Sequence, residues 1–299
     1  MFKKYKILFL FLVLIILGLI FYFNRIKIKE YFVKEEKIEL PGEIKFEEIQ
    51  NNLAELNLAD ETESIVNDVE SVETQNLASL DDKNNNLEDS TPNSSPEKNI
   101  SEIISTPNSE FNEGINLAVP FTIQSPDQKW NEPYKEGCEE ASILMVQYFL
   151  NDDNITVDLA LRDIQAMVDW QLENYGGHFD LPVSLTAQMT EEFLDMKAEL
   201  INLESIKDIK KIVQTGYPLI LPTAGRKLGN PNFIGEGPLY HMLVVKGFTV
   251  DGLIITNDPG TRKGENYVYD AEILWEAIAD WDEESKNPNQ NIKVGILLK

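Results

Sequence analysis

The chain has 299 residues, of which 51 are acidic and 26 are basic, and its formal net charge is −25. Nucleic acid is excluded as an expected partner, because its phosphate backbone is bound through basic patches. The single cysteine, Cys138, cannot close an intrachain disulfide or build a Cys-rich zinc site. We therefore expect no metal and no other cofactor.

The first 30 residues contain an apolar segment. The run from Ile7 to Phe23 carries no charge, and Lys and Arg residues flank it on both sides. Its length is near the lower end of what spans a bilayer. A bulky and basic sequence, Phe21–Arg25, follows where a cleavable signal peptide has small residues. The sequence predicts that residues 1–30 form an uncleaved single-pass anchor, with residues 7–23 in the lipid bilayer of the cell membrane and the C-terminal domain extracytoplasmic.

Residues 41–116 are poor in aromatic residues and rich in Asn, Ser, Asp, Glu and Thr. Such a composition buries too little apolar surface to offset the entropy of the chain. We expect a disordered acidic linker over this range, with a short helix from Phe46 to Leu58 as its one ordered element.

Residues 117–299 contain all four Trp residues, both His residues and the Cys. Apolar periodicity and stop signals predict helices beginning at Cys138 and within 159–172, 185–196, 205–214 and 270–281, and strands at 217–221, 240–250, 253–256 and 292–298. Asp251-Gly252 is a strong hairpin signal between the second and third of these strands. Helices followed by an antiparallel sheet predict the α+β class.

Cys138 stands at the predicted start of a helix, after Gly137. The unpaired N–H groups and the partial positive charge at such a position stabilise a thiolate. The sequence is therefore compatible with a nucleophilic cysteine. A buried structural thiol is the alternative, because free Cys is among the most buried residue types.

A cysteine nucleophile needs a base, and the chain offers only His178 and His241. His241 begins a predicted strand, whereas His178 lies in a glycine-containing loop, so His241 has the more rigid support and is the favoured base. An acceptor must orient the second ring nitrogen of the base. With the hairpin turn centred on Asp251-Gly252, Asp258 lies roughly opposite Val245, and it reaches His241 only if the pairing is twisted or bulged. A simple turn at Asp258-Pro259-Gly260 is the alternative.

These segments resemble the C39-like cysteine peptidases of the papain-like superfamily. The resemblance rests on 119–124 (VPFTIQ), Gly137-Cys138 before a helix, 240–242 (YHM) and 257–260 (NDPG), and it covers residues 117–299. It implies a papain-like fold, with N-terminal helices packed on an antiparallel β-sheet, in a bacterial membrane-anchored enzyme. It also implies that Cys138 attacks a carbonyl, His241 moves the proton and Asp258 orients His241. Gln124 is implied as the oxyanion-hole residue, with Gln128 as the second candidate.

The chain departs from many relatives in one respect: Glu139 and Glu140 follow the cysteine where Gly-Pro is common. Carboxylates beside a thiol raise its pKa and oppose the helix dipole. The effect is weak if both point to solvent. If either points into the cleft, it lowers activity or selects a basic substrate.

The leading interpretation is a cysteine peptidase that hydrolyses a peptide or protein substrate through a Cys138–His241–Asp258 triad and an acyl-enzyme. Two alternatives stay open: a papain-like surface module that binds but does not catalyse, and an amidase or acyltransferase on the same triad. Intact Gln124, Cys138, His241 and Asp258 favour an enzyme over the binding module. Peptidase and amidase share their covalent intermediate and are not distinguished by sequence.

Overall fold

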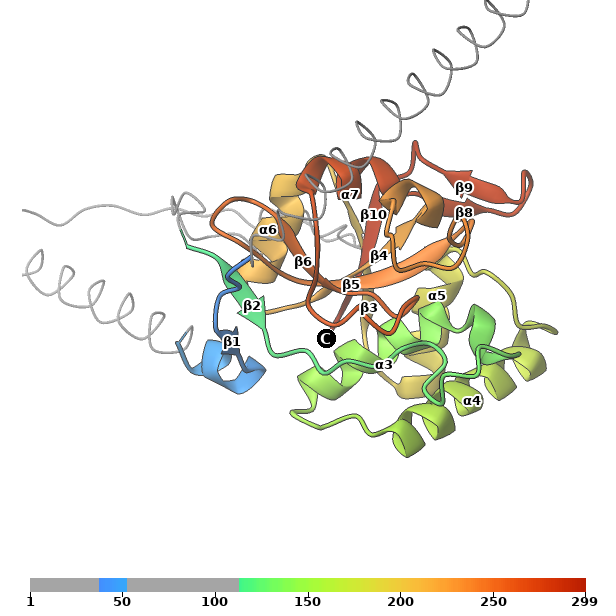
Figure 1. Cartoon of the computed structure of the whole chain (residues 1–299). Helices are drawn as coiled ribbons and strands as arrows, with labels where there is room; N and C mark the ends of the chain where they lie inside the picture. The colour runs from blue at the N-terminus through green and yellow to red at the C-terminus, as the bar shows by residue number, and fades with distance from the viewer. Residues whose placement is uncertain (1–37, 53–112) are drawn as a thin grey trace, which may run out of the picture. The chain divides into compact units, whose positions relative to one another are not determined.

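The computed structural model describes residues 38–52 and 113–299 (Figure 1). The chain divides into two units, 1–40 and 41–299, and the helices and strands described below belong to the second. The predicted anchor at 7–23 lies outside the described residues, as does most of the predicted linker. Within 38–52 and 113–299, no helix is both long enough and apolar enough to cross a membrane.

Among the described residues of the second unit, the helical elements are five α-helices, two 3-10 turns and a segment near the N-terminus. They are 46–52, η2 (Tyr134–Glu136), α3 (Cys138–Leu150), α4 (Val157–Asn174), α5 (Val183–Leu194), α6 (Ile206–Gln214), η3 (Gly225–Leu228) and α7 (Ala271–Ala277).

The strands form one large mixed sheet and one short hairpin. They are β1 (Glu43–Ile44), β2 (Ile115–Leu117), β3 (Ala198–Asn202), β4 (Leu219–Thr223), β5 (His241–Phe248), β6 (Ile254–Asn257), β7 (Tyr267–Tyr269), β8 (Asp280–Asp282), β9 (Asn287–Asn289) and β10 (Val294–Leu298).

Strand β5 is the centre of the large sheet. Along one edge it pairs antiparallel with β4 and then with β2, and along the other edge with β6. Strands β10 and β3 extend the sheet beyond β4, and β7 extends it beyond β6. All eight residues of β5 are buried, because helices cover both faces of the sheet: α3, α4 and α5 lie on one side and α6 and α7 on the other (Figure 1). The combination of helices and a sheet agrees with the predicted α+β class.

Two helices illustrate how the local sequence sets the fold. Ten of the residues of α3, from Cys138 to Phe149, are buried, as expected for a helix that is apolar around most of its circumference. Helix α6 begins with a capping box, in which the Ser205 side chain and the Asp208 side chain each bond the backbone of the other residue. Gly216, which follows the C-cap residue Thr215 of α6, has a φ of 90°, a conformation that glycine adopts without strain.

Residues 41–52 fold onto the domain, although the sequence analysis placed them in the linker. Glu43 and Ile44 pair in parallel with β2. Ile49 is 7% exposed, and the ring of Phe46 meets the rings of Phe149 and Tyr217 edge-on. The segment therefore contributes a strand and apolar side chains to the folded unit. We call residues 41–52 the N-terminal strap.

The predicted end of one helix lies four residues beyond the observed end. A single helix was expected over 270–281, but α7 ends at Ala277. Ile278 then forms a β-bridge with Thr223, and the Ala279 N–H donates to the Pro222 carbonyl. The apolar pattern continues through this point, so the sequence contains no stop signal. The helix ends here because the chain pairs with the end of β4.

Candidate active site

Cys138 is the first residue of α3, as the sequence predicted. Its own N–H is one of the helix's first four, which have no intrahelical acceptor. The side chain is 5% exposed. Its sulfur accepts a hydrogen bond from the Met242 N–H at 3.4 Å. The start of α3 is therefore tied to β5 at the residue directly after His241.

His241 begins β5, and its imidazole is held from several sides. The ring meets Phe233 edge-on at 5.4 Å between centroids. A Cβ on Gly260 would lie 3.1 Å from His241 Nε2, and one on Gly225 would lie 3.0 Å from His241 Cβ. Both glycines thus leave room that a side chain would take from the imidazole. The ring is 1% exposed, so its orientation is fixed by protein contacts.

Asp258 binds the imidazole, which the sequence analysis left open. Its Oδ1 lies 2.8 Å from His241 Nε2 and also accepts from the Gly260 N–H at 2.9 Å. Its Oδ2 accepts from the Tyr269 hydroxyl at 2.5 Å and from Asn230 Nδ2 at 3.2 Å. Burial on its own raises the pKa of Asp258, but His241 and the other donors lower it below the ordinary value.

A β-bulge brings Asp258 to the histidine. The strands β5 and β6 change register between Val245 and Gly247, so Asn257 pairs with Val244 rather than with Lys246. Asp258 is thereby moved toward the beginning of β5, where His241 lies. The bulged pairing that the sequence analysis named as a condition for this contact is present.

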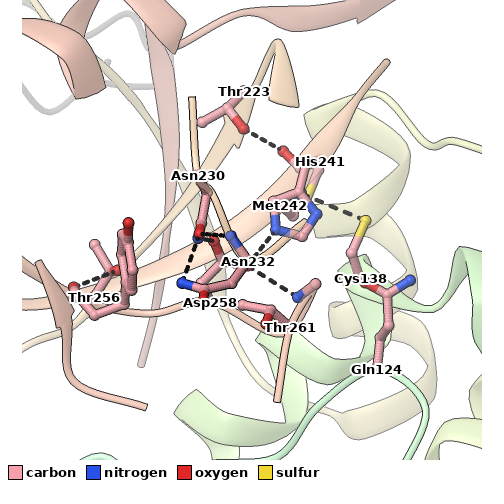
Figure 2. A network of polar contacts seen from close by, with 12 residues as sticks. Gln124, Cys138, Thr223, Asn230, Asn232, His241, Met242, Thr256, Asp258 and Thr261 are labelled. Atoms are coloured by element: carbon pink, nitrogen blue, oxygen red, sulfur yellow. Dashed lines mark hydrogen bonds and ion pairs between the residues drawn. The ribbon is translucent and has the colours of Figure 1, made fainter. Parts of the chain in front are cut away.

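The free edge of the imidazole faces the cysteine. Because Nε2 is taken by Asp258, Nδ1 is the ring nitrogen left for a reacting group. Figure 2 shows the His241 ring and the Cys138 sulfur turned toward each other, with Asp258 on the opposite side of the ring. The three residues therefore lie in the order thiol, imidazole, carboxylate. That order suits proton transfer from a nucleophile to a base.

Gln124 lies beside Cys138 (Figure 2), and Gln128 does not share this place. The Gln124 backbone N–H donates to the Pro259 carbonyl at 3.0 Å. One N–H of its side-chain amide donates to the Lys135 carbonyl at 2.5 Å, so the second amide hydrogen points elsewhere. Gln128 is exposed, accepts from Arg262 at 3.2 Å, and lines a surface pocket in which Cys138 takes no part.

His178 binds Glu140 and not the cysteine. Its Nε2 lies 3.1 Å from Glu140 Oε1. Burial lowers the pKa of His178, but the bond to Glu140 and the charge of Glu140 raise it above the ordinary value overall. The imidazole of His178 therefore pairs with Glu140.

Both carboxylates after the cysteine turn inward. Glu139 and Glu140 are each 1% exposed, so the solvent-pointing arrangement considered in the sequence analysis is wrong. Glu139 Oε2 accepts from the Cys138 thiol at 3.0 Å. Burial, then Glu139 and Asp180, raise the pKa of the Cys138 thiol well above its ordinary value, and the Met242 N–H opposes this. The expected lowering of the thiol pKa by the helix start is therefore outweighed by burial and the neighbouring carboxyl groups.

Three residues that surround His241 and Asp258 were missed by the sequence analysis: Asn230, Phe233 and Tyr269. Asn230 and Tyr269 bind the carboxylate, and Phe233 packs against the imidazole. Asn230 and Phe233 come from the connection between β4 and β5, and Tyr269 from β7. Nothing in their local sequence marks them, because only the folding of the sheet brings them to Asp258. Within the described ranges, no group of three or more His, Cys, Asp or Glu residues is arranged to hold a metal ion.

A comparison with known families covers most of the folded domain. Residues 116–287 match the sequence model of the Peptidase_C39 like family. The match spans more than half of the chain. The protein belongs to the C39-like peptidase family.

Two further comparisons add little to this C39-like assignment. No curated protein matches the chain. A crystal structure from Bacillus anthracis, described as that of a candidate C39-like peptidase, shares 18% identity at a TM-score of 0.40, over 62% of this chain and 98% of the other. The family assignment rests on the match over residues 116–287.

Proposed function

We propose that this C39-like protein is a papain-like cysteine peptidase that hydrolyses peptide bonds in a peptide or protein substrate. In this proposal Cys138 is the nucleophile, His241 the base and Asp258 the residue that orients the base. The observation that supports it best is the link between two distant segments: the Cys138 sulfur bonds the Met242 N–H, and the neighbouring His241 bonds Asp258. A structural thiol would not require an oriented imidazole beside it.

The first half of the reaction forms an acyl-enzyme. His241 Nδ1 takes the proton of the Cys138 thiol, and the sulfur attacks the scissile carbonyl carbon. The carbonyl oxygen gains the negative charge, which in this proposal is bound by the Cys138 N–H and the second amide hydrogen of Gln124. The C–N bond then breaks, the imidazolium gives its proton to the leaving amine, and a thioester remains on Cys138.

The second half releases the acid. Water loses a proton to His241 Nδ1 and attacks the thioester carbonyl, the C–S bond breaks, and the sulfur leaves as the thiolate with the proton held on the imidazolium. Asp258 keeps the imidazole in one orientation through both halves and stabilises its cationic form. Tyr269 serves Asp258 as a donor, because burial and the Asp258 charge raise the pKa of Tyr269 and keep it a phenol.

The test compares the full-length chain with Cys138→Ser and His241→Ala, using a peptide mixture read by mass spectrometry for new termini. We expect both variants to lose hydrolysis by about 10³-fold or more. His178→Ala is the matched control and should retain it, because His178 pairs with Glu140. Hydrolysis that survives Cys138→Ser would refute the proposal. Products joined to an added amine, without free acid, would identify an acyltransferase instead.

We further propose that the enzyme is held at the cell surface by a single-pass anchor at residues 7–23, with the peptidase domain outside. The support is the uncharged apolar run and the absence of small residues after it. Protease added to intact cells should remove the domain and leave an anchored N-terminal fragment. Protection of the domain until the cells are lysed would reverse the proposed orientation.

A further inference from the structure

Glu139 and Glu140 are adjacent and equally buried, yet their carboxyl groups bind different residues. Glu140 bonds Gln171 and His178, on the side of α4. Glu139 turns the other way: Oε1 accepts from the Leu181 N–H at 3.0 Å, and Oε2 accepts from the Cys138 thiol at 3.0 Å. Only Glu139 therefore touches the nucleophile of the proposed reaction.

The contact fixes the sulfur between a donor and an acceptor. The Met242 N–H approaches Cys138 Sγ from β5 at 3.4 Å, and Glu139 Oε2 receives the thiol hydrogen. The sulfur thus acts both as a hydrogen-bond acceptor and as a hydrogen-bond donor. In this resting arrangement the thiol proton is directed to Glu139 and not to His241.

The surroundings of Glu139 do not supply a compensating cation. The ionisable groups that face it are Cys138 and Glu140 on α3, Asp180 in the loop before α5, and Tyr240 immediately before β5. Among the described residues, no Lys or Arg forms an ion pair or a hydrogen bond with Glu139. Burial, then Glu140 and Asp180, raise the pKa of Glu139 well above its ordinary value, whereas Cys138 and Leu181 oppose the rise.

Two negative charges 3.0 Å apart and shielded from water repel strongly, because a poorly solvated site screens them little. A Cys138 thiolate beside an ionised Glu139 is therefore disfavoured. A thiolate beside a protonated Glu139 is stabilised, because the carboxylic acid can donate its hydrogen to the sulfur.

We propose that Glu139 is a positioning residue that masks the nucleophile: its carboxyl group binds the Cys138 thiol, an ionised carboxyl group disfavours the thiolate, and a protonated carboxyl group stabilises it. The inference rests on the proposed role of Cys138 as the nucleophile. The proton of the thiol passes to His241 Nδ1, and the proton of Glu139 stays on the carboxyl group and bonds the sulfur. The reactive site then holds one thiolate, one imidazolium and one neutral acid.

Alkylation of the only cysteine by iodoacetamide, measured against pH on the full-length chain by mass spectrometry, tests this directly. We expect the wild-type midpoint to lie above about 8.5, the value of a free thiol. Glu139→Gln keeps an acceptor for the Leu181 N–H and offers the sulfur a neutral donor. It should lower the midpoint by about one pH unit or more, which makes alkylation about tenfold faster at any pH below the midpoint.

Glu140→Gln is the matched control, since it removes the same charge from the adjacent residue without touching the sulfur. We expect its alkylation rate to stay within about twofold of wild type across the pH range, because its carboxylate contacts Gln171 and His178 instead. An unchanged midpoint in Glu139→Gln overturns the proposal. Equal shifts in the two variants also overturn it, because they would report a general charge effect.

A second measurement needs no variant and stands even if Glu139→Gln does not fold. The chain has one thiol, so its infrared spectrum has one S–H stretching band. In the wild-type protein we expect this band at the lowered frequency of a thiol that donates to a carboxyl group. A band at the frequency of an unbonded thiol overturns the proposal. Loss of hydrolysis in Cys138→Ser tests the proposed function separately, because alkylation and the S–H band do not depend on turnover.

Discussion

We expect the N-terminal strap to stabilise the domain, and the loss of one ion pair measures its contribution to the free energy of unfolding. Lys246 in β5 is 1% exposed at its side chain, and its ammonium group lies 2.8 Å from Glu43 Oε1 and 2.7 Å from Asn266 Oδ1. Glu43 belongs to the strap and is 48% exposed at its side chain. Glu43→Ala removes the only carboxylate in contact with a buried ammonium group among the described residues.

The magnitude follows from the exposure of the two partners. Breaking a fully buried ion pair costs about 3–5 kcal/mol, and an exposed pair contributes about 0–1 kcal/mol. With Lys246 buried, Glu43 half-exposed and Asn266 still bonded, we expect Glu43→Ala to lower the free energy of unfolding by about 2 kcal/mol. For a domain of this size that corresponds to about 4–8 °C in Tm.

Thermal unfolding followed by circular dichroism measures the change. Lys45→Ala is the matched control: its ion pair with Asp152, at 3.7 Å, is exposed on both sides, so its loss should cost less than about 0.5 kcal/mol. Adding Lys246→Met to Glu43→Ala should restore most of the loss, because an apolar side chain of similar length needs no partner. A Glu43→Ala variant that unfolds like Lys45→Ala would refute the reasoning.

The same pair predicts a dependence on pH. Burial raises the pKa of Glu43, but its hydrogen bonds and the charge of Lys246 lower it below the ordinary value overall. A carboxylate with a lowered folded-state pKa stabilises the fold above its unfolded-state pKa, and this contribution is lost as the pH falls through the folded-state pKa. The difference in Tm between wild type and Glu43→Ala should therefore be largest near neutral pH and shrink in acid.

Three more predictions concern the site and the strap. Asp258→Asn should lower kcat/KM for peptide hydrolysis by about 10²-fold or more while Cys138 remains open to alkylation, because the imidazole loses the charge that stabilises its cation; equal activity would remove Asp258 from the mechanism. Ile49→Ala should cost about 2–3 kcal/mol in urea unfolding, as expected for a large-to-small change at a buried site; a cost below about 0.5 kcal/mol would show that the strap is not packed. A protease site inserted near residue 80 should yield two fragments that co-elute in gel filtration, because the strap pairs with β2; separate elution would contradict that pairing.

The parts of the fold that depend on local sequence could be predicted. Helix α6 was expected to end before Gly216, and it ends at Gln214. The turn at Asp251-Gly252 correctly placed the β5–β6 hairpin. The strap could not be found in this way, because its partners lie far along the chain: Glu43 binds Lys246, and Ile49 packs against Gly216. Contacts of that separation are set by the folded sheet and leave no periodic signal in the sequence.

In the candidate site, too, the residues marked by local sequence could be predicted and those set by long-range contacts could not. The sequence singled out Cys138, His241 and Asp258 through a helix start, a strand start and a strand end, and the structure brings the three together. The local sequence contains no signal for the donors Asn230 and Tyr269 at Asp258, since these contacts depend on how separate segments meet in the fold. The orientation of Glu139 was likewise open, because both residues after Cys138 lie on the first turn of α3 and only the packed neighbours decide which one reaches the sulfur.

Asp258 and Glu139, the two carboxyl groups nearest the proposed chemistry, have opposite environments. This difference explains their proposed roles. Asp258 receives four hydrogen bonds from donors, including the imidazole, and its pKa is lowered, so it is held as an anion that stabilises a cationic base. Glu139 receives one backbone N–H and the thiol, faces other acidic groups, and has a raised pKa. Opposed environments of this kind commonly separate a carboxyl group that stays ionised from one that takes up a proton more readily. A cysteine placed between an imidazole and such an acid becomes a thiolate only when the imidazole takes the proton, so the base and the mask act together on the same sulfur.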